Sequence, residues 1–312
     1  MPESELYIKM RDLPTEQINQ DTKDIDTISL SQLLYKINNE DLKVAPAVRE
    51  QIPNIEKAVE FVVASFKHNA SLVYVGAGTS GRLGVVDASE CPPTFGSAPN
   101  MVRAIIAGGN EAMFKAQEGA EDKPENAIID LKKEAITKFD TVCGIAASGR
   151  TPYIKSALDY AKSLNCKTIL ITTSSLESLK LFEVSADIII NVSVGPEVVA
   201  GSTRMKSGTA QKLVLNMIST AAMVRLGKTY ENVMIDLQLT NNKLKERAKK
   251  TIMNISGVDY DKAEYYLELA HNNVKTALMM ILSDLDYKSA KEYLDKNSGF
   301  LKLALDNYKM EG

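Results

Sequence analysis

A short stretch of glycine and hydroxyl residues, 75–84, has the composition of an anion-binding turn. It reads Val-Gly-Ala-Gly-Thr-Ser-Gly-Arg-Leu-Gly. Thr79 and Ser80 carry hydroxyls beside Gly78, and backbone N–H groups at the start of a helix complete a site for a single phosphate or a sugar. The alternative is that the turn serves only as the cap of the helix that follows it.

Three glycines of this stretch also match G-x-G-x-x-G, the pattern of dinucleotide-binding turns. They are Gly76, Gly78 and Gly81. A dinucleotide site has an acidic residue at the end of the second strand, where it holds the ribose hydroxyls. Here the second apolar run ends Ile-Ala-Gly-Gly at 106–109, without an acidic residue. The stretch therefore indicates a phosphate or sugar site better than a dinucleotide site.

A second turn of the same kind lies at 147–152, after another apolar run. It offers two hydroxyls, a cation and a glycine that lets the backbone approach a ligand closely: Ser148, Gly149, Arg150 and Thr151. Pro152 suits the first turn of a helix. Two hydroxyl-bearing turns at one edge of a sheet indicate a phosphorylated polyol.

A third stretch, 195–206, is rich first in glycine, then in hydroxyls and then in basic residues. Ser202 adds a hydroxyl, and Glu197 is a spare carboxylate near the site. Arg204 and Lys206 can neutralise an anion.

Five short apolar runs alternate with helical stretches: 72–75, 102–106, 142–147, 168–172 and 186–192. Runs of this length, rich in β-branched residues, predict a parallel sheet that is covered on both faces. Such sheets bind ligands at the carboxyl ends of their strands, so the loops after the first and third runs become the candidate site. The predicted fold class is α/β, a three-layer αβα sandwich with a five-stranded parallel sheet.

Helices are predicted on both sides of this sheet in the sequence. Apolar residues keep helical spacing over 30–37 and 55–63, and a long helix is expected after Gly201. Near the C-terminus, Asp259 and its neighbours recur from Asp286 onward, 27 positions later, so each unit is expected to be a helix pair.

We therefore expect three parts in the chain. They are an N-terminal helical segment over 1–56, a sugar-phosphate-binding domain over 57–235 and a small C-terminal helical module over 236–312.

Composition argues against several classes of partner. The chain has 312 residues and a net charge of −3, which gives no reason to expect nucleic acid or an anionic membrane. No apolar run approaches the ~20 residues that span a bilayer, and the acidic N-terminus, residues 1–5, lacks the pattern of a signal peptide. Three cysteines without metal-ligand spacing suit a reducing compartment, so we expect a cytoplasmic location and no metal site.

Longer strings around these turns resemble known proteins. The two hydroxyl turns and the loop that contains Glu197 are similar to those of the sugar isomerase (SIS) domain. Five strings together resemble the N-acetylmuramic acid 6-phosphate etherase family: 76–84, 87–94, 106–109, 118–122 and 200–206. Residues 15–19 and 273–275 fit as well, so the resemblance covers nearly the whole chain. The same family includes the glucokinase regulatory protein, a longer chain with two sugar-binding domains.

The resemblance implies a lyase that cleaves the lactyl ether at carbon 3 of N-acetylmuramic acid 6-phosphate. The two catalytic carboxylates of the family fall on Glu90 and Glu121. On pattern alone, Glu90 could equally be a solvated residue that ends a helix before Pro92, and Glu121 belongs to an acidic patch typical of a surface. The two histidines, His68 and His271, lie outside the motifs and are expected to be structural.

Two carboxylates are sufficient for this reaction. In the open-chain sugar, carbon 1 is an aldehyde, which acidifies the proton on carbon 2. One carboxylate removes that proton, the other protonates the departing lactyl oxygen, and water then adds across the double bond, so no metal or redox cofactor is needed. The family suggests Glu121 as the base and Glu90 as the acid, roles that the sequence alone does not assign.

Spacing separates Glu90 from the first hydroxyl turn. In an unbroken helix from Ser80, Glu90 would lie about 15 Å away, at ~1.5 Å per residue, too far to touch the same small sugar. Either the helix ends early or Glu90 reaches the site of a neighbouring subunit. We expect a homodimer with the site at the subunit interface.

Two other functions fit parts of the sequence. One is an isomerase that acts on a sugar phosphate with Glu197 as its base, although no histidine for ring opening lies near the motifs. The other is a sugar-phosphate sensor without catalysis, which the presence of both Glu90 and Glu121 disfavours.

Overall fold

The computed structural model describes residues 13–239 and 241–311, so the acidic N-terminus at 1–5 lies outside the described residues. Contacts divide the described chain into two compact units. The first holds the residues up to Ser89 and Asn100–Ser219, and the second holds Glu90–Pro99 and the residues from Thr220 onward. Within the described ranges, no helix has the length and apolar character needed to cross a membrane.

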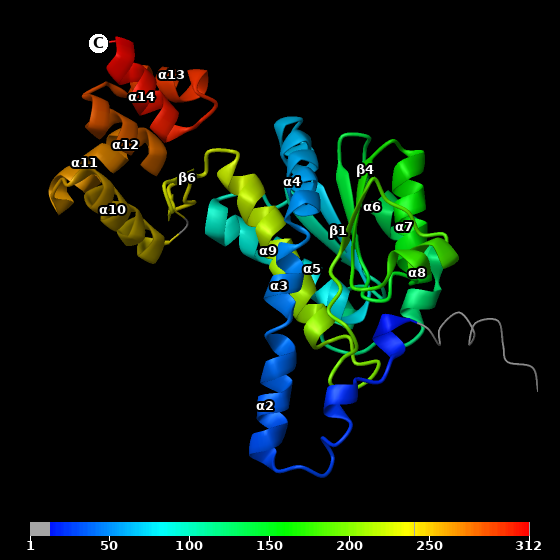
Figure 1. Cartoon of the computed structure of the whole chain (residues 1–312). Coiled ribbons are helices and arrows are strands. Elements are labelled where there is room, and N and C mark those ends of the chain that lie inside the picture. The colour runs from blue at the N-terminus through cyan, green and yellow to red at the C-terminus, as the bar shows by residue number, and fades with distance from the viewer. Residues whose placement is uncertain (1–12, 240, 312) are drawn as a thin grey trace, which may run out of the picture. The chain divides into compact units, whose positions relative to one another are not determined.

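Five parallel strands form the central sheet of the first unit, in the order β2-β1-β3-β4-β5 (Figure 1). The strands are β1 (Leu72–Gly76), β2 (Val102–Ile106), β3 (Thr141–Ile145), β4 (Lys167–Thr172) and β5 (Ile188–Asn191). Gly76 pairs with Ile106 on one side and with Ile145 on the other, so the carboxyl ends of β2, β1 and β3 lie level. The parallel sheet predicted from the five apolar runs is confirmed.

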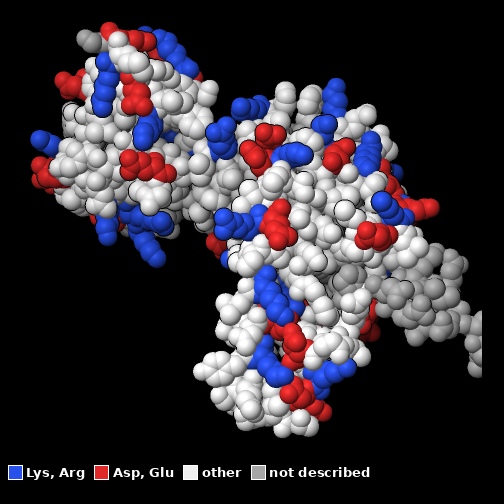
Figure 2. Space-filling model, in the orientation of Figure 1, with Lys and Arg blue, Asp and Glu red and all other residues white. Residues whose placement is uncertain are grey.

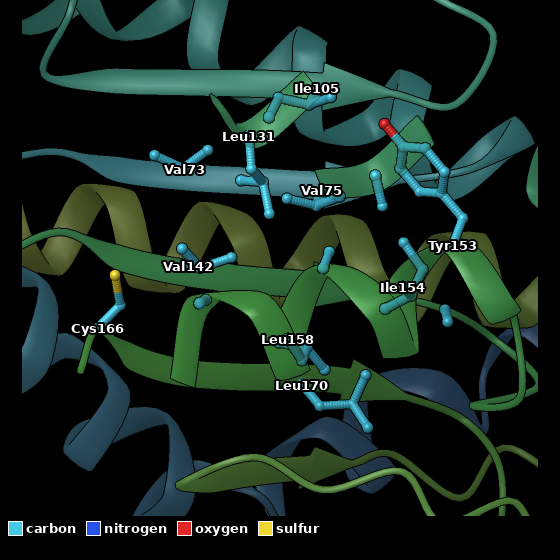
Figure 3. Close-up of a cluster of buried hydrophobic side chains, with 14 of the residues drawn as sticks. Val73, Val75, Ile105, Leu131, Val142, Tyr153, Ile154, Leu158, Cys166 and Leu170 are labelled. Atoms are coloured by element: carbon cyan, nitrogen blue, oxygen red, sulfur yellow. The ribbon is translucent and has the colours of Figure 1, made fainter. Parts of the chain in front are cut away.

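Helices cover both faces of this sheet. One face packs against α6 (Pro124–Lys133) and α7 (Pro152–Ser163), and Figure 3 shows Val73 and Val75 of β1 in the same core as Leu158 of α7. The helices of the other face are α4 (Ile52–Lys67), α5 (Gly78–Phe95) and α9 (Lys206–Val224). The three-layer αβα sandwich is therefore confirmed.

A buried polar cluster ties α5 and α9 to the sheet. Side chains alternate along a strand, so Tyr74 points away from the core of Figure 3. Its hydroxyl donates to Asp87 Oδ2 at 2.9 Å, while Asn216 Nδ2 and Ser219 Oγ donate to Asp87 Oδ1 at 2.9 and 3.1 Å. Burial raises the pKa of the Asp87 carboxyl, and these three hydrogen bonds oppose that rise.

Short helices precede the sheet, as predicted: η1 (Pro14–Glu16), η2 (Gln20–Thr22), α2 (Leu30–Asp41) and α3 (Val44–Arg49). Figure 1 shows α2 extending away from the sheet. It exposes large apolar side chains, with Leu30 70%, Leu34 58% and Tyr35 69% accessible to solvent. Figure 2 shows basic and acidic side chains interspersed over the face in view. Lys36 Nζ of α2 and Asp24 Oδ1 are 2.6 Å apart.

The loops at the carboxyl ends of the strands carry three more short helices: η3 (Asn110–Met113), η4 (Ala120–Asp122) and α8 (Leu176–Leu181).

The second unit is mainly helical. A short hairpin of β6 (Thr229–Tyr230) and β7 (Val233–Met234) precedes five helices: α10 (Asn242–Ser256), α11 (Tyr260–Leu269), α12 (Val274–Ser283), α13 (Tyr287–Lys296) and α14 (Leu301–Glu311). Asp259 and Asp286 occupy the same position before α11 and α13, where each caps the helix by accepting from a backbone N–H. Each predicted repeat is thus a helix pair.

Candidate active site

The first hydroxyl turn runs directly from β1 into α5. A Cβ on Gly76 would lie 2.5 Å from Gly81 N, so this close approach of strand and helix requires glycine. Gly78 has φ +52° and is exposed. Ser80 is buried and donates to Gln211 Oε1 of α9 at 2.9 Å, which leaves Thr79 as the accessible hydroxyl of the turn.

The second hydroxyl turn connects β3 to α7. Gly149 has φ +68°, a backbone conformation that favours glycine, and a Cβ there would lie 2.4 Å from Leu179 Cδ2, so a larger residue would be strained. The half-buried Ser148 accepts from Arg150 N at 3.4 Å, and Thr151 occupies the position before Pro152, the first residue of α7 as predicted.

Hydroxyls at the end of β4 and directly after it join this second turn to α9. Thr172 Oγ1 and Thr173 Oγ1 each donate to Ala147 O at 3.1 Å. Thr173 Oγ1 also lies 3.0 Å from Ser207 Oγ in the first turn of α9. Because Ser80 contacts Gln211 in the next turn of α9, both hydroxyl turns lie beside the start of that helix.

Glu197 is fully buried and caps the start of α9. Its Oε2 accepts from Lys206 N and its Oε1 from Ser207 N, both at 2.9 Å. A carboxylate at this position satisfies N–H groups that have no partner within the helix and compensates the positive end of the helix dipole. Glu197 therefore holds the helix that supports both hydroxyl turns. Ser202 lies half-buried in the loop between Glu197 and the start of α9.

Lys206 points its ammonium group at a carboxylate from the N-terminal part of the chain. Lys206 Nζ and Glu40 Oε2 are 2.5 Å apart, and the two residues are only 1% and 3% exposed. Lys43 Nζ lies 2.5 Å from the other oxygen of Glu40. Burial opposes ionisation of Glu40, but the hydrogen bonds from the two lysines outweigh it and hold the pKa of the carboxyl below its usual range.

The same N-terminal part also holds the loop that follows β5. Asn19 Nδ2 donates to Pro196 O at 3.2 Å, and Thr22 Oγ1 donates to Val198 O at 2.9 Å. Residues 15–19, which fit the resemblance, thus lie against the loop that contains Glu197.

A cavity of about 180 Å³ lies beside the start of α5, and both Glu121 and the first hydroxyl turn line it. Its lining comes from the first hydroxyl turn, from α5 and from the loop between β2 and α6: Ala77, Gly78, Arg82, Ala107, Ala112 and 116–121. Both acidic residues of the lining, Glu118 and Glu121, are exposed. The structure therefore places Glu121 and Gly78 around one cavity, although they are far apart in the sequence.

Arg82 is the residue of this cavity to which sequence reasoning assigned no role. It lies one helical turn after Gly78, and its Nε donates to Ala112 O at 3.0 Å and to Met113 O at 3.1 Å. Its spacing from Gly78 was the available signal, because residues four apart share one face of a helix. The backbone carbonyls that it contacts have no signature in the sequence.

Glu90 lies further along α5 and is exposed. The helix does not end before Pro92 but continues through Pro92 and Pro93 to Phe95. Because α5 is unbroken between Ser80 and Glu90, their separation along the helix is about 15 Å at ~1.5 Å per residue. The first of the two alternatives for Glu90, an early end of the helix, is therefore wrong.

Histidine and cysteine side chains lie outside this site. His68 stacks on Phe139 and His271 meets Tyr287 edge to face, with ring centroids 5.1 and 4.7 Å apart. All three cysteines are buried, and none of them forms a disulfide. Over the described ranges, no three His, Cys, Asp or Glu side chains are grouped so that they could hold a metal ion.

Comparison with known proteins adds relatives of high identity. The family model of the glucokinase regulatory protein N-terminal SIS domain matches residues 54–162. An N-acetylmuramic acid 6-phosphate etherase of Salinibacter ruber is 54% identical over 308 residues, which are 98% of each chain. One of Oceanobacillus iheyensis is 52% identical over 93% of this chain and 98% of its own. Among solved structures, a phosphoheptose isomerase from Francisella tularensis is 18% identical, with a TM-score of 0.47 over 64% of this chain and 100% of its own.

Proposed function

Because this chain belongs to the N-acetylmuramic acid 6-phosphate etherase family, we infer that it cleaves the D-lactyl ether at carbon 3 of N-acetylmuramic acid 6-phosphate. The chain is a carbon–oxygen lyase of cell-wall amino-sugar breakdown, and its products are N-acetylglucosamine 6-phosphate and D-lactate. The identity of 54% over 98% of both chains is the observation that carries this conclusion.

The phosphate is bound by the two hydroxyl turns at the carboxyl end of the sheet. The proposed ligands are Gly78, Thr79, Ser80, Ser148, Gly149, Arg150, Thr151 and Ser202, with Ser80 acting through its backbone N–H because its hydroxyl is engaged with Gln211. Glu197 and Lys206 act on the same site through α9, since Glu197 caps the helix and Lys206 pairs with Glu40. Support comes from the hydrogen bonds that bring both turns to the start of α9.

Glu121 is the proposed base, because it lines a cavity together with the first turn. In the open-chain sugar it takes the proton from carbon 2, and the electron pair of that C–H bond forms the double bond between carbons 2 and 3. The C3–O bond breaks, and Glu90 donates a proton to the departing lactyl oxygen. Water then adds its oxygen to carbon 3 and a proton to carbon 2, so the sequence is redox-neutral.

The position of Glu90 supports a homodimer with the site at the subunit interface. Since α5 is unbroken, Glu90 lies too far along it to reach the sugar at the turn that begins the same helix. We propose that the acid comes from the second copy. The exposed apolar side chains of α2 are consistent with an oligomer, because such clusters on a surface often mark protein interfaces.

The isomerase alternative depended on Glu197 as a base. Both of its oxygens accept backbone N–H groups of α9, and the residue is 0% exposed, so it does not face a ligand. We place the reaction in the cytoplasm, where reducing conditions suit three cysteines that form no disulfide.

The test is release of D-lactate from N-acetylmuramic acid 6-phosphate by the wild-type protein and by Glu90→Gln and Glu121→Gln. Glu118→Gln is the matched control, because it removes a carboxylate from the same cavity. We expect both proposed catalytic variants to lose at least about 100-fold in kcat and the control to stay within a few-fold. Equal lactate release by all four proteins would refute the assigned roles.

A separate measurement tests elimination followed by hydration. The reaction is run in water enriched in heavy oxygen, and the label is then located by mass spectrometry. Elimination predicts label at carbon 3 of the sugar, whereas label in the lactate would show cleavage on the lactyl side.

A further inference from the structure

Arg82 presents unused hydrogen-bond donors at the cavity that contains Glu121. Its Nε is held by the carbonyls of Ala112 and Met113 at 3.0 and 3.1 Å, which fixes the plane of the guanidinium. Among the residues that the structure describes, no hydrogen bond or ion pair is formed by the two terminal amino groups of Arg82. A guanidinium has five N–H donors, so four of them remain for a ligand.

The charges that line the cavity favour an anionic ligand group next to Arg82. Of the described residues that line the cavity, Arg82 is the single cation, beside the carboxylates Glu118 and Glu121. An anionic substrate group that entered this space without a cation would be repelled by both glutamates. Arg82 is therefore the group that can make the cavity accept a carboxylate.

The substrate of the proposed function carries two anionic groups. The 6-phosphate is bound by the hydroxyl turns, which leaves the lactyl carboxylate without a counter-charge. That carboxylate is attached through the ether oxygen at carbon 3, next to the carbon 2 at which Glu121 acts. A group that binds it must lie in the same cavity as Glu121, and Arg82 does.

We propose that Arg82 binds the lactyl carboxylate and thereby distinguishes the muramic acid phosphate from the same amino-sugar phosphate without the lactyl group. This assignment rests on the proposed function. A guanidinium fixed at Nε presents its remaining donors in a planar fork that matches the two oxygens of a carboxylate. Arg82 is a specificity residue, and it takes no part in the proton transfers.

The test compares the affinities of substrate and product. Binding is measured by calorimetry in the Glu121→Gln background, where the substrate stays intact, with N-acetylmuramic acid 6-phosphate and N-acetylglucosamine 6-phosphate as ligands. We expect Arg82→Met to weaken substrate binding about 10- to 100-fold and to leave product binding within about 2-fold. Arg82→Lys should fall between, because it keeps the charge but not the fork.

Two controls separate recognition from support of the loop. Lys115→Met removes a cation from the same loop that does not line the cavity, and it should change neither affinity. The second control is a substrate analogue in which a neutral carboxamide replaces the lactyl carboxylate. The protein that retains Arg82 should bind this analogue more weakly than the substrate, whereas the Arg82→Met variant should bind the two with equal affinity.

Several outcomes would overturn the assignment. If Arg82→Met and Arg82→Lys weaken substrate and product to the same degree, Arg82 only holds the loop through its Nε contacts. If neither variant changes the substrate affinity, the carboxylate is bound elsewhere. Failure of the proposed function is seen separately, because wild-type protein would then release no lactate.

Discussion

The buried pair of Lys206 and Glu40 should make one substitution in the N-terminal segment unusually costly. Glu40→Gln removes the only counter-charge that the structure shows, among the described residues, for the 1% exposed Lys206. Removal of one partner of a buried pair leaves an uncompensated charge and costs about 3–5 kcal/mol. We expect that loss in the free energy of unfolding of the first unit.

The opposite substitution should cost less, because Glu40 has a second partner. After Lys206→Met, Glu40 keeps Lys43, whose side chain is 50% exposed, so we expect a loss of about 1–3 kcal/mol. Lys43→Met is the matched control and should cost about 1 kcal/mol or less, since an exposed lysine contributes little.

Unfolding of the first unit is measured by urea titration combined with thiol labelling. Cys143 is fully buried in β3, so the urea concentration at which it becomes reactive reports unfolding of the sheet. The labelled peptide is identified by mass spectrometry, which separates it from Cys91 in the second unit. The expected order of destabilisation is Glu40→Gln, then Lys206→Met, then Lys43→Met.

The lowered pKa of Glu40 adds a dependence on pH. A carboxyl whose pKa is lower in the folded protein stabilises it above the unfolded pKa of about 4.3, and this contribution is lost as the pH falls through the folded value. The difference between wild type and Glu40→Gln should therefore be full at pH 7 and shrink below about pH 4. A difference that is no larger than that of Lys43→Met, or that stays constant into acid, would refute the reasoning.

Three further substitutions test the elements around the site and in the second unit. Gly149→Ala should cost at least about 1–2 kcal/mol of unfolding free energy, because φ is +68° and the new Cβ would lie 2.4 Å from Leu179 Cδ2. It should also weaken phosphate binding. Urea titration measures the first effect, and phosphate competition in the lactate assay measures the second. Asp87→Ala leaves the donors of Tyr74, Asn216 and Ser219 without their acceptor and should cost about 2–4 kcal/mol by the Cys143 assay, whereas a cost below that of a surface substitution would contradict the buried cluster. Asp286→Ala should lower the melting temperature of the second unit through loss of about 1 kcal/mol of capping energy, and Asp259→Ala should do the same, since both cap repeated helices in the same way.

The strands and both hydroxyl turns could be predicted because their causes are local. The middle of a strand that is buried on both faces must be apolar, as in 169–171. A chain that turns from strand into helix at close range must use glycine, as at Gly76. Both requirements can be recognised from residues that are consecutive in the sequence. The carboxyl ends of the strands are then the expected place for the site, by the rule for parallel sheets, whereas the order of the strands comes from the structure.

The partners of the charged residues could not be predicted in this way. Lys206 meets Glu40, which is 166 positions away, and no local pattern selects that carboxylate from the others in the chain. Arg82 binds backbone carbonyls, which every residue has. The sequence pattern therefore identified cations near the site, while only the fold shows which of them are paired with a carboxylate of the protein.

The pairing of Glu197 has a consequence for how the site selects phosphate. The start of α9 lies beside both hydroxyl turns, and an uncapped helix start there would attract any anion through its free N–H groups. Glu197 already occupies the N–H groups of Lys206 and Ser207, and Glu40 already occupies the ammonium of Lys206. The positive groups at the start of α9 are thus compensated within the protein, so in the proposed site the phosphate is recognised by the hydroxyls, the backbone and Arg150 of the turns themselves. Such a site offers several donors to a tetrahedral group with several acceptor oxygens. Arg82, the cation of the cavity that Glu121 lines, can then bind the second, carboxylate anion of the proposed substrate.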